Sequence, residues 1–211
     1  MLNISQSILV VIDMQQIFLR NIQNHQNLTT LVDNICKRID FYKKHLRPIF
    51  IVEYYIHDEE DFRIQTIGKI LNRVSNYPLT WFILKERDSA CPEILQIVNK
   101  EVQLDYLLFN HGFVGQKREY FENHVLSLAM KKNIHLLSDY SFMRFISFEC
   151  VGVNASCCVL QTAFDLSLSD HNFSSFISAP CAYDVYTSEW PHQNVVFQEE
   201  EIKNKVNLIY V

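Results

Sequence analysis

The chain has 211 residues, of which 48% are hydrophobic and 20% are charged, so it can form a packed core and wholesale disorder is excluded. Only four residues are glycine, and none falls in the G-x-G-x-x-G or G-x-x-x-x-G-K-[ST] spacing of phosphate-binding loops. The net charge of −5, without a basic block, argues against nucleic-acid binding. A chain of this length predicts a single domain over residues 1–211.

The N-terminal apolar stretch is short and lacks the basic region of a signal peptide. No apolar run approaches the roughly 20 residues that a membrane-spanning helix needs. The six cysteines contain no C-x-x-C pair of the kind that binds zinc. We therefore expect a cytoplasmic protein with reduced thiols, no cofactor and no membrane partner.

Short, continuous apolar runs alternate with longer segments of helical spacing along the chain. Continuous runs predict strands buried on both faces, as in parallel sheets, and we expect them at residues 8–12, 48–52, 106–109, 146–153 and 173–177. Helical spacing predicts helices over residues 28–46, 120–131 and 157–168. This alternation predicts an α/β fold with a mostly parallel, doubly wound sheet.

Residues 56–80 do not follow this alternation. The segment begins with an acidic run and becomes amphipathic toward its end. A charge run of this kind is usually a solvated face. We expect this segment to form a lid or insertion between the second and third strands.

Polar residues follow three of the expected strands, at the edge where open α/β sheets bind ligands. Asp13 follows the first strand, Asn110 the third and Asn154 the fourth, with Cys157 and Cys158 at the start of the next helix. A helix N-terminus lowers the pKa of a cysteine, and a nearby carboxylate can accept its proton. Spacing alone leaves two structural alternatives to a catalytic site open: the aspartate can be a turn residue, and the cysteine can be a packed, unreactive thiol.

Two motifs resemble those of the isochorismatase-like cysteine hydrolase superfamily. Residues 12–19, I-D-M-Q-Q-I-F-L, resemble its I-D-M-Q-x-x-F-L opening, and residues 152–165 resemble its G-V-x-[TA]-x-x-C-V-x-x-T-A-x-D signature. Looser similarities are found at residues 91–94, 110–113 and 190–192. The resemblance extends over nearly the whole chain.

This resemblance implies a three-layer α/β/α sandwich with an Asp-Lys-Cys catalytic triad. Matched position by position, Cys158 is the nucleophile and Asp13 the general base. The signature also implies a cis peptide between Val153 and Asn154, with the amides of Asn154 and Cys158 forming an oxyanion hole. Cys157 is the competing thiol, and we expect it to be a packing residue because adjacent helical side chains point about 100° apart.

One catalytic position departs from the family pattern. Asn110 occupies the place where the resemblance puts the triad lysine, and Lys85 and Lys117 fall in other parts of the pattern. Three interpretations stay open: an active enzyme in which Asn110 takes the orienting place, a lysine supplied from elsewhere, or a degenerate member that binds without turnover. Because the cysteine is kept, the resemblance favours hydrolysis of a C–N bond in a small amide, ureide or carbamoyl compound.

Substrate contacts and partners complete these expectations. The family fold would bring Phe18, Trp81 and Phe113 near the crevice, although each is as readily a core residue. The loop after the second strand lacks the D-x-H of a nicotinamidase-type metal site, so we expect no metal. We expect a small-molecule substrate, no nucleic acid and a homo-oligomer.

Overall fold

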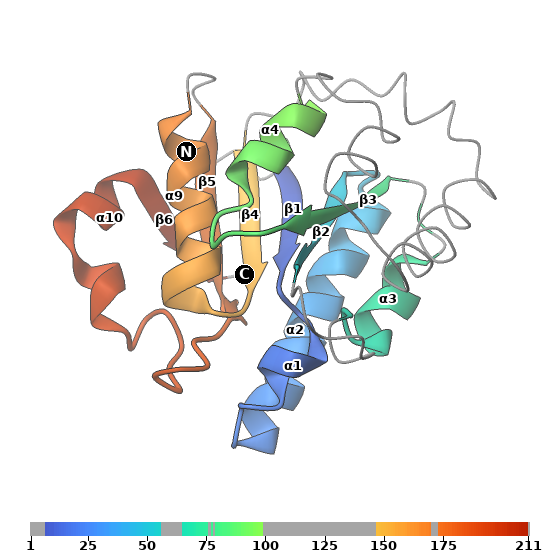
Figure 1. The fold of residues 1–211 in the computed structure, drawn as a ribbon, viewed down its shortest axis with the longest axis horizontal. Coiled ribbons are helices and arrows are strands. Elements are labelled where there is room, and N and C mark those ends of the chain that lie inside the picture. Colours follow the sequence, from blue (N-terminus) through green and yellow to red (C-terminus); the bar gives the residue numbers. More distant parts are fainter. Residues whose placement is uncertain are drawn as a thin grey trace.

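A computed structural model describes residues 7–55, 65–75, 77, 79–98, 147–169 and 173–210 of the chain. Within these residues, six parallel strands form one sheet in the order β3-β2-β1-β4-β5-β6 (Figure 1). The strands are β1 (Ser7–Ile12), β2 (Ile49–Tyr54), β3 (Thr80–Lys85), β4 (Ser147–Gly152), β5 (Ser174–Ala182) and β6 (Val206–Ile209).

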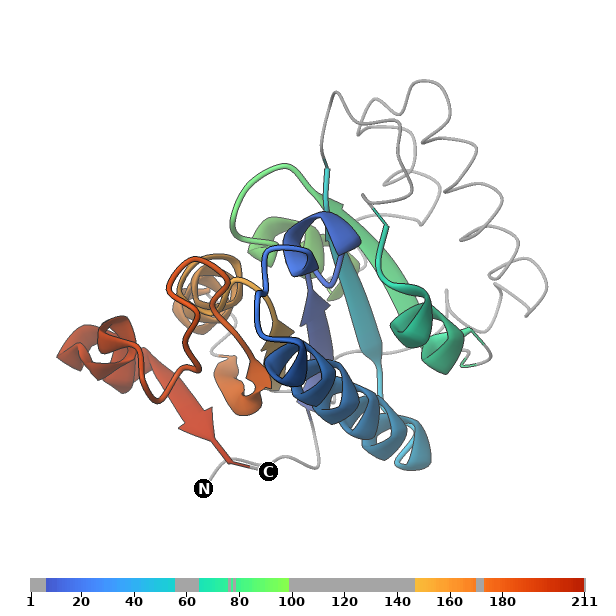
Figure 2. The ribbon, with the colours of Figure 1, turned by 90° about the horizontal axis from the view of Figure 1, so that it is seen from below.

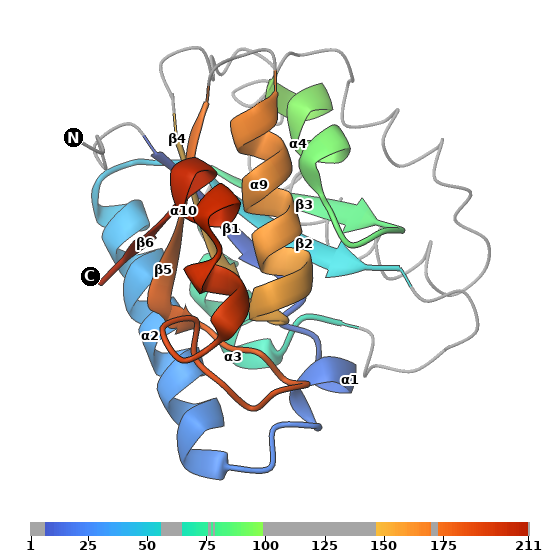
Figure 3. The same cartoon turned by 90° about the vertical axis from the view of Figure 1, so that its left-hand side faces the viewer.

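Helices cover both faces of this sheet, which gives three layers (Figure 2). One face packs against α2 and α3, and the other against α4 and α9, with α10 beside α9 at the β6 edge (Figure 3). The described helices are α1 (Gln16–Leu19), α2 (His25–Lys44), α3 (Gly68–Val74), α4 (Cys91–Val98), the π-helix η5 (Ala155–Val159), α9 (Leu160–Leu168), the 3-10 helix η6 (Val195–Gln198) and α10 (Glu200–Lys205).

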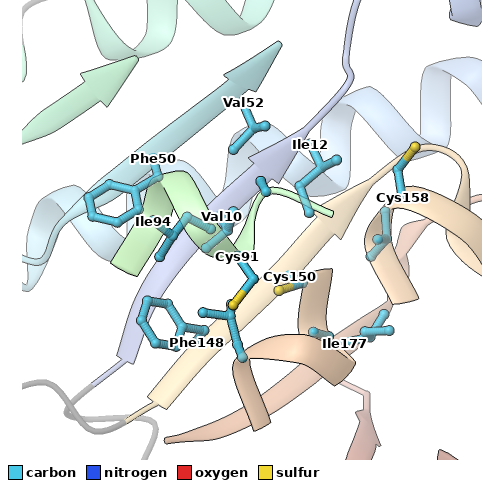
Figure 4. Close-up of a cluster of buried hydrophobic side chains, with 14 of the residues drawn as sticks. Val10, Ile12, Phe50, Val52, Cys91, Ile94, Phe148, Cys150, Cys158 and Ile177 are labelled. Carbon is cyan, nitrogen blue, oxygen red and sulfur yellow. The ribbon is translucent and has the colours of Figure 1, made fainter. Parts of the chain in front are cut away.

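The strand sequences are apolar throughout because both faces of the sheet are covered. Every residue of β1 is buried, and alternate side chains enter opposite layers. Val10 packs in the cluster beneath α4 and α9, whereas Leu9 and Val11 pack in the cluster beneath α2. Figure 4 shows part of the first cluster, with Cys158 at its margin. The predicted α/β/α fold is therefore confirmed.

A buried ion pair ties α2 to the centre of the sheet. The Arg38 guanidinium donates from Nε and Nη2 to the two carboxylate oxygens of Glu149, at 2.7 and 2.5 Å. The Tyr42 hydroxyl donates to the same carboxylate at 2.9 Å and lies 2.6 Å from the Ser7 hydroxyl. Bidentate geometry and the tyrosine compensate the desolvation of this pair, which fixes α2 on β1 and β4.

Strand order determines where a ligand can bind. The chain winds outward from β1 in both directions, so the order reverses between β1 and β4. Ile12 pairs with Gly152 at the carboxyl ends of these two strands. Open α/β sheets bind ligands at such a switch point, just beyond the carboxyl ends.

Four of the five predicted strands match β1, β2, β4 and β5, whereas the expected strand at 106–109 lies outside the described residues. Strand β3 was not expected. The segment predicted as a lid contains α3, whose Ile70, Leu71 and Val74 are buried against α2. In its described part, this segment is therefore a packed crossover helix. None of the described helices is long and apolar enough to span a membrane.

Candidate active site

Asp13 follows β1 directly and lies at the switch point. Its backbone is left-handed, with φ of 53°, and its amide donates to the Val52 carbonyl at 2.9 Å. The side chain is fully buried, and neither carboxylate oxygen accepts a well-aligned hydrogen bond from a described residue. A buried carboxylate without hydrogen bonds needs a nearby cation.

Lys85 supplies that cation from the end of β3, two strands away. Its Nζ lies 2.9 Å from Asp13 Oδ2, and both side chains are completely buried. The ammonium also donates to the carbonyls of Arg87 at 3.2 Å and Asp88 at 2.9 Å. It lies 4.8 Å from the centre of the Tyr54 ring, in a cation–π contact. These contacts fix the ammonium against Asp13.

Cys158 completes the group from the turn after β4. The thiol interacts with both Asp13 and Lys85, and its residue is only 6% exposed. Figure 4 shows its sulfur pointing away from the other labelled core side chains. The neighbouring Cys157 is exposed, so the expectation that it is a packing residue is wrong. The structure thus brings a carboxylate, an ammonium and a single thiol together.

Burial and mutual charge perturb all three groups. Desolvation raises the pKa of Asp13, against the opposing effect of the Lys85 charge. Desolvation and the Asp13 charge likewise raise the pKa of the Cys158 thiol, although Lys85 opposes this. Burial lowers the pKa of Lys85, but its two partners outweigh burial and the net pKa is raised. Lys85 is therefore an ammonium at neutral pH, and Cys158 is a thiol.

This result corrects one expectation. The helix N-terminus was expected to lower the pKa of Cys158 and so produce a thiolate. In the structure, desolvation beside a carboxylate outweighs that effect. Asp13, whose raised pKa makes it a stronger base, is in contact with this thiol and can accept its proton.

The turn that carries Cys158 is tightly built. The Val153–Asn154 peptide is cis, as the resemblance implies. The Asn154 carbonyl accepts from the amides of Cys157 and Val159, each at 3.2 Å. Gly152 has φ of 125°, and a Cβ at this position would overlap the Ile12 carbonyl. Only glycine therefore lets β4 approach β1 this closely before the turn.

Asp184 fixes the other side of this turn. One carboxylate oxygen accepts from the Ser156 amide at 2.9 Å and from the Ser156 hydroxyl. The other accepts from the amides of Tyr186 and Thr187, at 3.0 and 3.1 Å. These hydrogen bonds outweigh burial and lower the pKa of Asp184, so it carries a negative charge at the start of η5.

Of the three open interpretations, the structure favours a lysine supplied from elsewhere in the chain, because an ammonium lies 2.9 Å from the Asp13 carboxylate. Lys85 is in direct contact with both, although it is distant from them in sequence. Asn110, which was expected to take the orienting place, lies outside the described residues. The signal for Lys85 was present in the apolar run Trp81–Leu84, which resembles the other buried strands and ends in this charged residue.

The three predicted aromatic contacts have different positions. Phe18, on α1, makes an edge-to-face contact with Tyr54 at 6.2 Å between ring centres. Because Tyr54 in turn contacts the Lys85 ammonium, Phe18 is linked to Lys85 through this one ring. Trp81 is 4% exposed and packs in the core against Phe50, near the opposite end of β3. Its placement does not support substrate contact. Phe113 lies outside the described residues.

Tyr54 was not expected at the site, and Gln15 holds it there. The Gln15 side chain donates to the Tyr54 carbonyl at 3.0 Å and accepts from its amide at 2.6 Å. Glu53, beside Tyr54, is buried and accepts from the Thr66 amide at 2.8 Å.

Within the described ranges, no group of three or more His, Cys, Asp or Glu side chains could hold a metal ion.

Comparison with known proteins identifies the fold. No protein-family model matches the sequence, and no curated protein is similar to it. A ribonuclease from Caenorhabditis elegans matches 100% of this chain and 79% of its own, at 16% identity and TM-score 0.58. A nicotinamidase from Staphylococcus aureus matches 98% and 99%, at 15% identity and TM-score 0.56. An isochorismatase from Pseudomonas putida matches 98% and 88%, at 14% identity and TM-score 0.56. The chain therefore has the isochorismatase-like fold.

Proposed function

We propose that this protein is a cysteine hydrolase that cleaves a C–N bond in a small amide, ureide or carbamoyl compound. The observation that carries the proposal is the contact of Lys85 with Asp13, 2.9 Å apart, beside the Cys158 thiol. These three groups match the Asp-Lys-Cys triad that the sequence resemblance implies. They converge at the switch point of the sheet, where such folds bind ligands.

The first half of the reaction forms a thioester. As the Cys158 sulfur bonds to the substrate carbonyl carbon, its proton passes to Asp13 and the C=O π electrons move onto the oxygen. We assign stabilisation of that oxyanion to the backbone amides of Asn154 and Cys158. Asp13 then gives the proton to the leaving nitrogen, the C–N bond breaks and the amine departs.

The second half regenerates the enzyme. Asp13 accepts a proton from water as the water oxygen attacks the thioester carbon. When the tetrahedral intermediate collapses, the S–C bond breaks, an acid is released and the proton returns to Cys158. Lys85 keeps Asp13 oriented and stabilises its anionic form between these transfers.

The alternative, a degenerate member that binds without turnover, was motivated by the apparent loss of the triad lysine. Lys85 removes that motive, because a buried ammonium lies next to Asp13. Phe18 remains a candidate substrate contact through its position beside Tyr54. Homo-oligomer formation also remains a prediction, which light scattering of the purified chain tests.

A panel of small amides, ureides and carbamoyl compounds, assayed by release of ammonia or amine, tests the proposal. We expect the wild type and Cys157→Ala to hydrolyse the same compounds, and Cys158→Ala to be inactive. The Cys157 variant is the matched control, because it removes the adjacent exposed thiol. Equal hydrolysis by wild type and Cys158→Ala would refute the proposal.

A further inference from the structure

Cys158 faces a second carboxylate besides Asp13. Its Sγ lies 3.9 Å from Oδ1 of Asp88, an exposed residue three positions after Lys85. The Asp88 carbonyl accepts from Lys85 Nζ at 2.9 Å. The lysine that contacts Asp13 therefore also holds the backbone of Asp88 beside the thiol.

The charges around the thiol do not balance. Lys85 compensates Asp13, since the two form a buried ion pair. Asp88 forms no ion pair with any of the residues that the structure describes. Its charge acts on its surroundings, because it contributes to raising the pKa of Asp13 and of the exposed Tyr186. Among the described residues, Asp88 therefore places next to the Cys158 thiol a carboxylate that no ion pair offsets.

We propose that Asp88 determines substrate specificity by selecting compounds with an N–H donor or a cationic group beside the scissile carbonyl and rejecting carboxylates. This inference rests on the proposed role of Cys158 as nucleophile. A substrate carbon in reach of Sγ places its substituents next to Asp88 Oδ1, which can accept hydrogen bonds but donates none when ionised. A nearby negative charge on the substrate is repelled.

This charge narrows the substrate class. Among amides, ureides and carbamoyl compounds, those with a terminal NH₂ or a neighbouring ammonium can donate to Asp88. Compounds with a carboxylate next to the reacting carbonyl bring like charges together. We therefore infer a neutral or cationic ureido, carbamoyl or amino-substituted amide as the substrate.

Charged and neutral alkylating agents test this inference without a known substrate. In the Cys157→Ser background, the rates of Cys158 modification by iodoacetamide, iodoacetate and 2-bromoethylamine are measured by peptide mapping. We expect Asp88→Asn to raise the iodoacetate rate relative to iodoacetamide by about five- to tenfold, the effect of one unit charge about 4 Å away in a nearly aqueous medium. The relative rate of the cationic reagent should fall. Glu86→Gln, a neighbouring exposed carboxylate, is the matched control and should leave the ratios unchanged.

Three results would overturn the inference, and they are distinguishable. Unchanged rate ratios in Asp88→Asn would refute charge selection and leave the reactive Cys158 intact. An equal change for all three reagents would show that Asp88 acts on the thiol itself. A Cys158 that resists every reagent in the folded protein would refute both this inference and the proposed function.

Discussion

Replacement of Lys85 by methionine tests the ion pair on which the site depends. At 2.9 Å, with an effective dielectric constant of about 20, the attraction between Lys85 and Asp13 is about 6 kcal/mol. Asp13 can avoid that loss by taking up a proton. For a carboxyl with an unperturbed pKa of 3.8, protonation at pH 7 costs about 4 kcal/mol, at about 1.36 kcal/mol for each pH unit. Protonation therefore limits the cost of losing Lys85 to about that value.

We expect Lys85→Met to lower the free energy of unfolding by about 2–4 kcal/mol, because burial of Asp13 is then uncompensated. The matched control is Asp13→Asn with Lys85→Met, which removes both charges and should recover most of the loss. Urea unfolding of the wild type, the two single variants and the double variant gives the coupling energy. Additivity within about 0.5 kcal/mol would refute the ion pair.

The pH dependence gives a second check on the same variant. Without Lys85, the pKa of Asp13 in the folded state rises further above its unfolded value of 3.8. A raised folded pKa means that the folded state binds the proton more tightly. The destabilisation is therefore small below pH 3.8 and grows as the pH rises toward the folded pKa. A loss of stability that is the same at pH 4 and pH 7 would contradict this reasoning.

Three further predictions concern the frame of the site. Gly152→Ala should lower the free energy of unfolding by at least about 4 kcal/mol, because the added Cβ would overlap backbone at positive φ. The control Gly68→Ala, with open space around it, should change that free energy by less than about 1 kcal/mol. Similar urea midpoints for the two variants would contradict this prediction. Glu149→Gln should lower the free energy of unfolding by about 3 kcal/mol, because the Arg38 guanidinium is left buried without a counter-charge. An unchanged urea midpoint would contradict this contribution of the ion pair. Asp184→Ala should slow alkylation of Cys158 about tenfold, because the hydrogen bonds that the charged Asp184 accepts at the start of η5 are lost. An unchanged alkylation rate in folded protein would exclude a role of Asp184 in positioning this thiol.

Much of the fold could be predicted from the sequence, because strands buried on both faces need continuous apolar runs. This signal located β1, β2, β4 and β5. The same apolar signal is present in β3. It was missed because the acidic run earlier in this segment favoured a lid and because β3 begins and ends with polar residues. Strand order could not be predicted, since it depends on contacts between elements that are distant in sequence.

The site follows the same division. Asp13, Cys158 and the cis peptide at Asn154 belong to local motifs, so the sequence alone located them. Lys85 ends a strand that lies two positions from β1 in the sheet, so its contact with Asp13 depends on the strand order and not on a local motif. Trp81 illustrates the opposite limit, because nothing local distinguishes a core tryptophan from one that lines a pocket.

We expect Cys158 to form a thioester whose hydrolysis depends on Asp13. Peptide mass spectrometry after mixing the Cys157→Ser protein with p-nitrophenyl acetate tests this directly. The leaving group of this activated ester departs without protonation, so the ester can acylate a thiol readily. We expect an acetyl group on Cys158 that is lost at least about 100-fold more slowly when Asp13 is also replaced by asparagine. An acetyl group on another residue, or equal rates of loss with and without the Asp13 carboxylate, would contradict it.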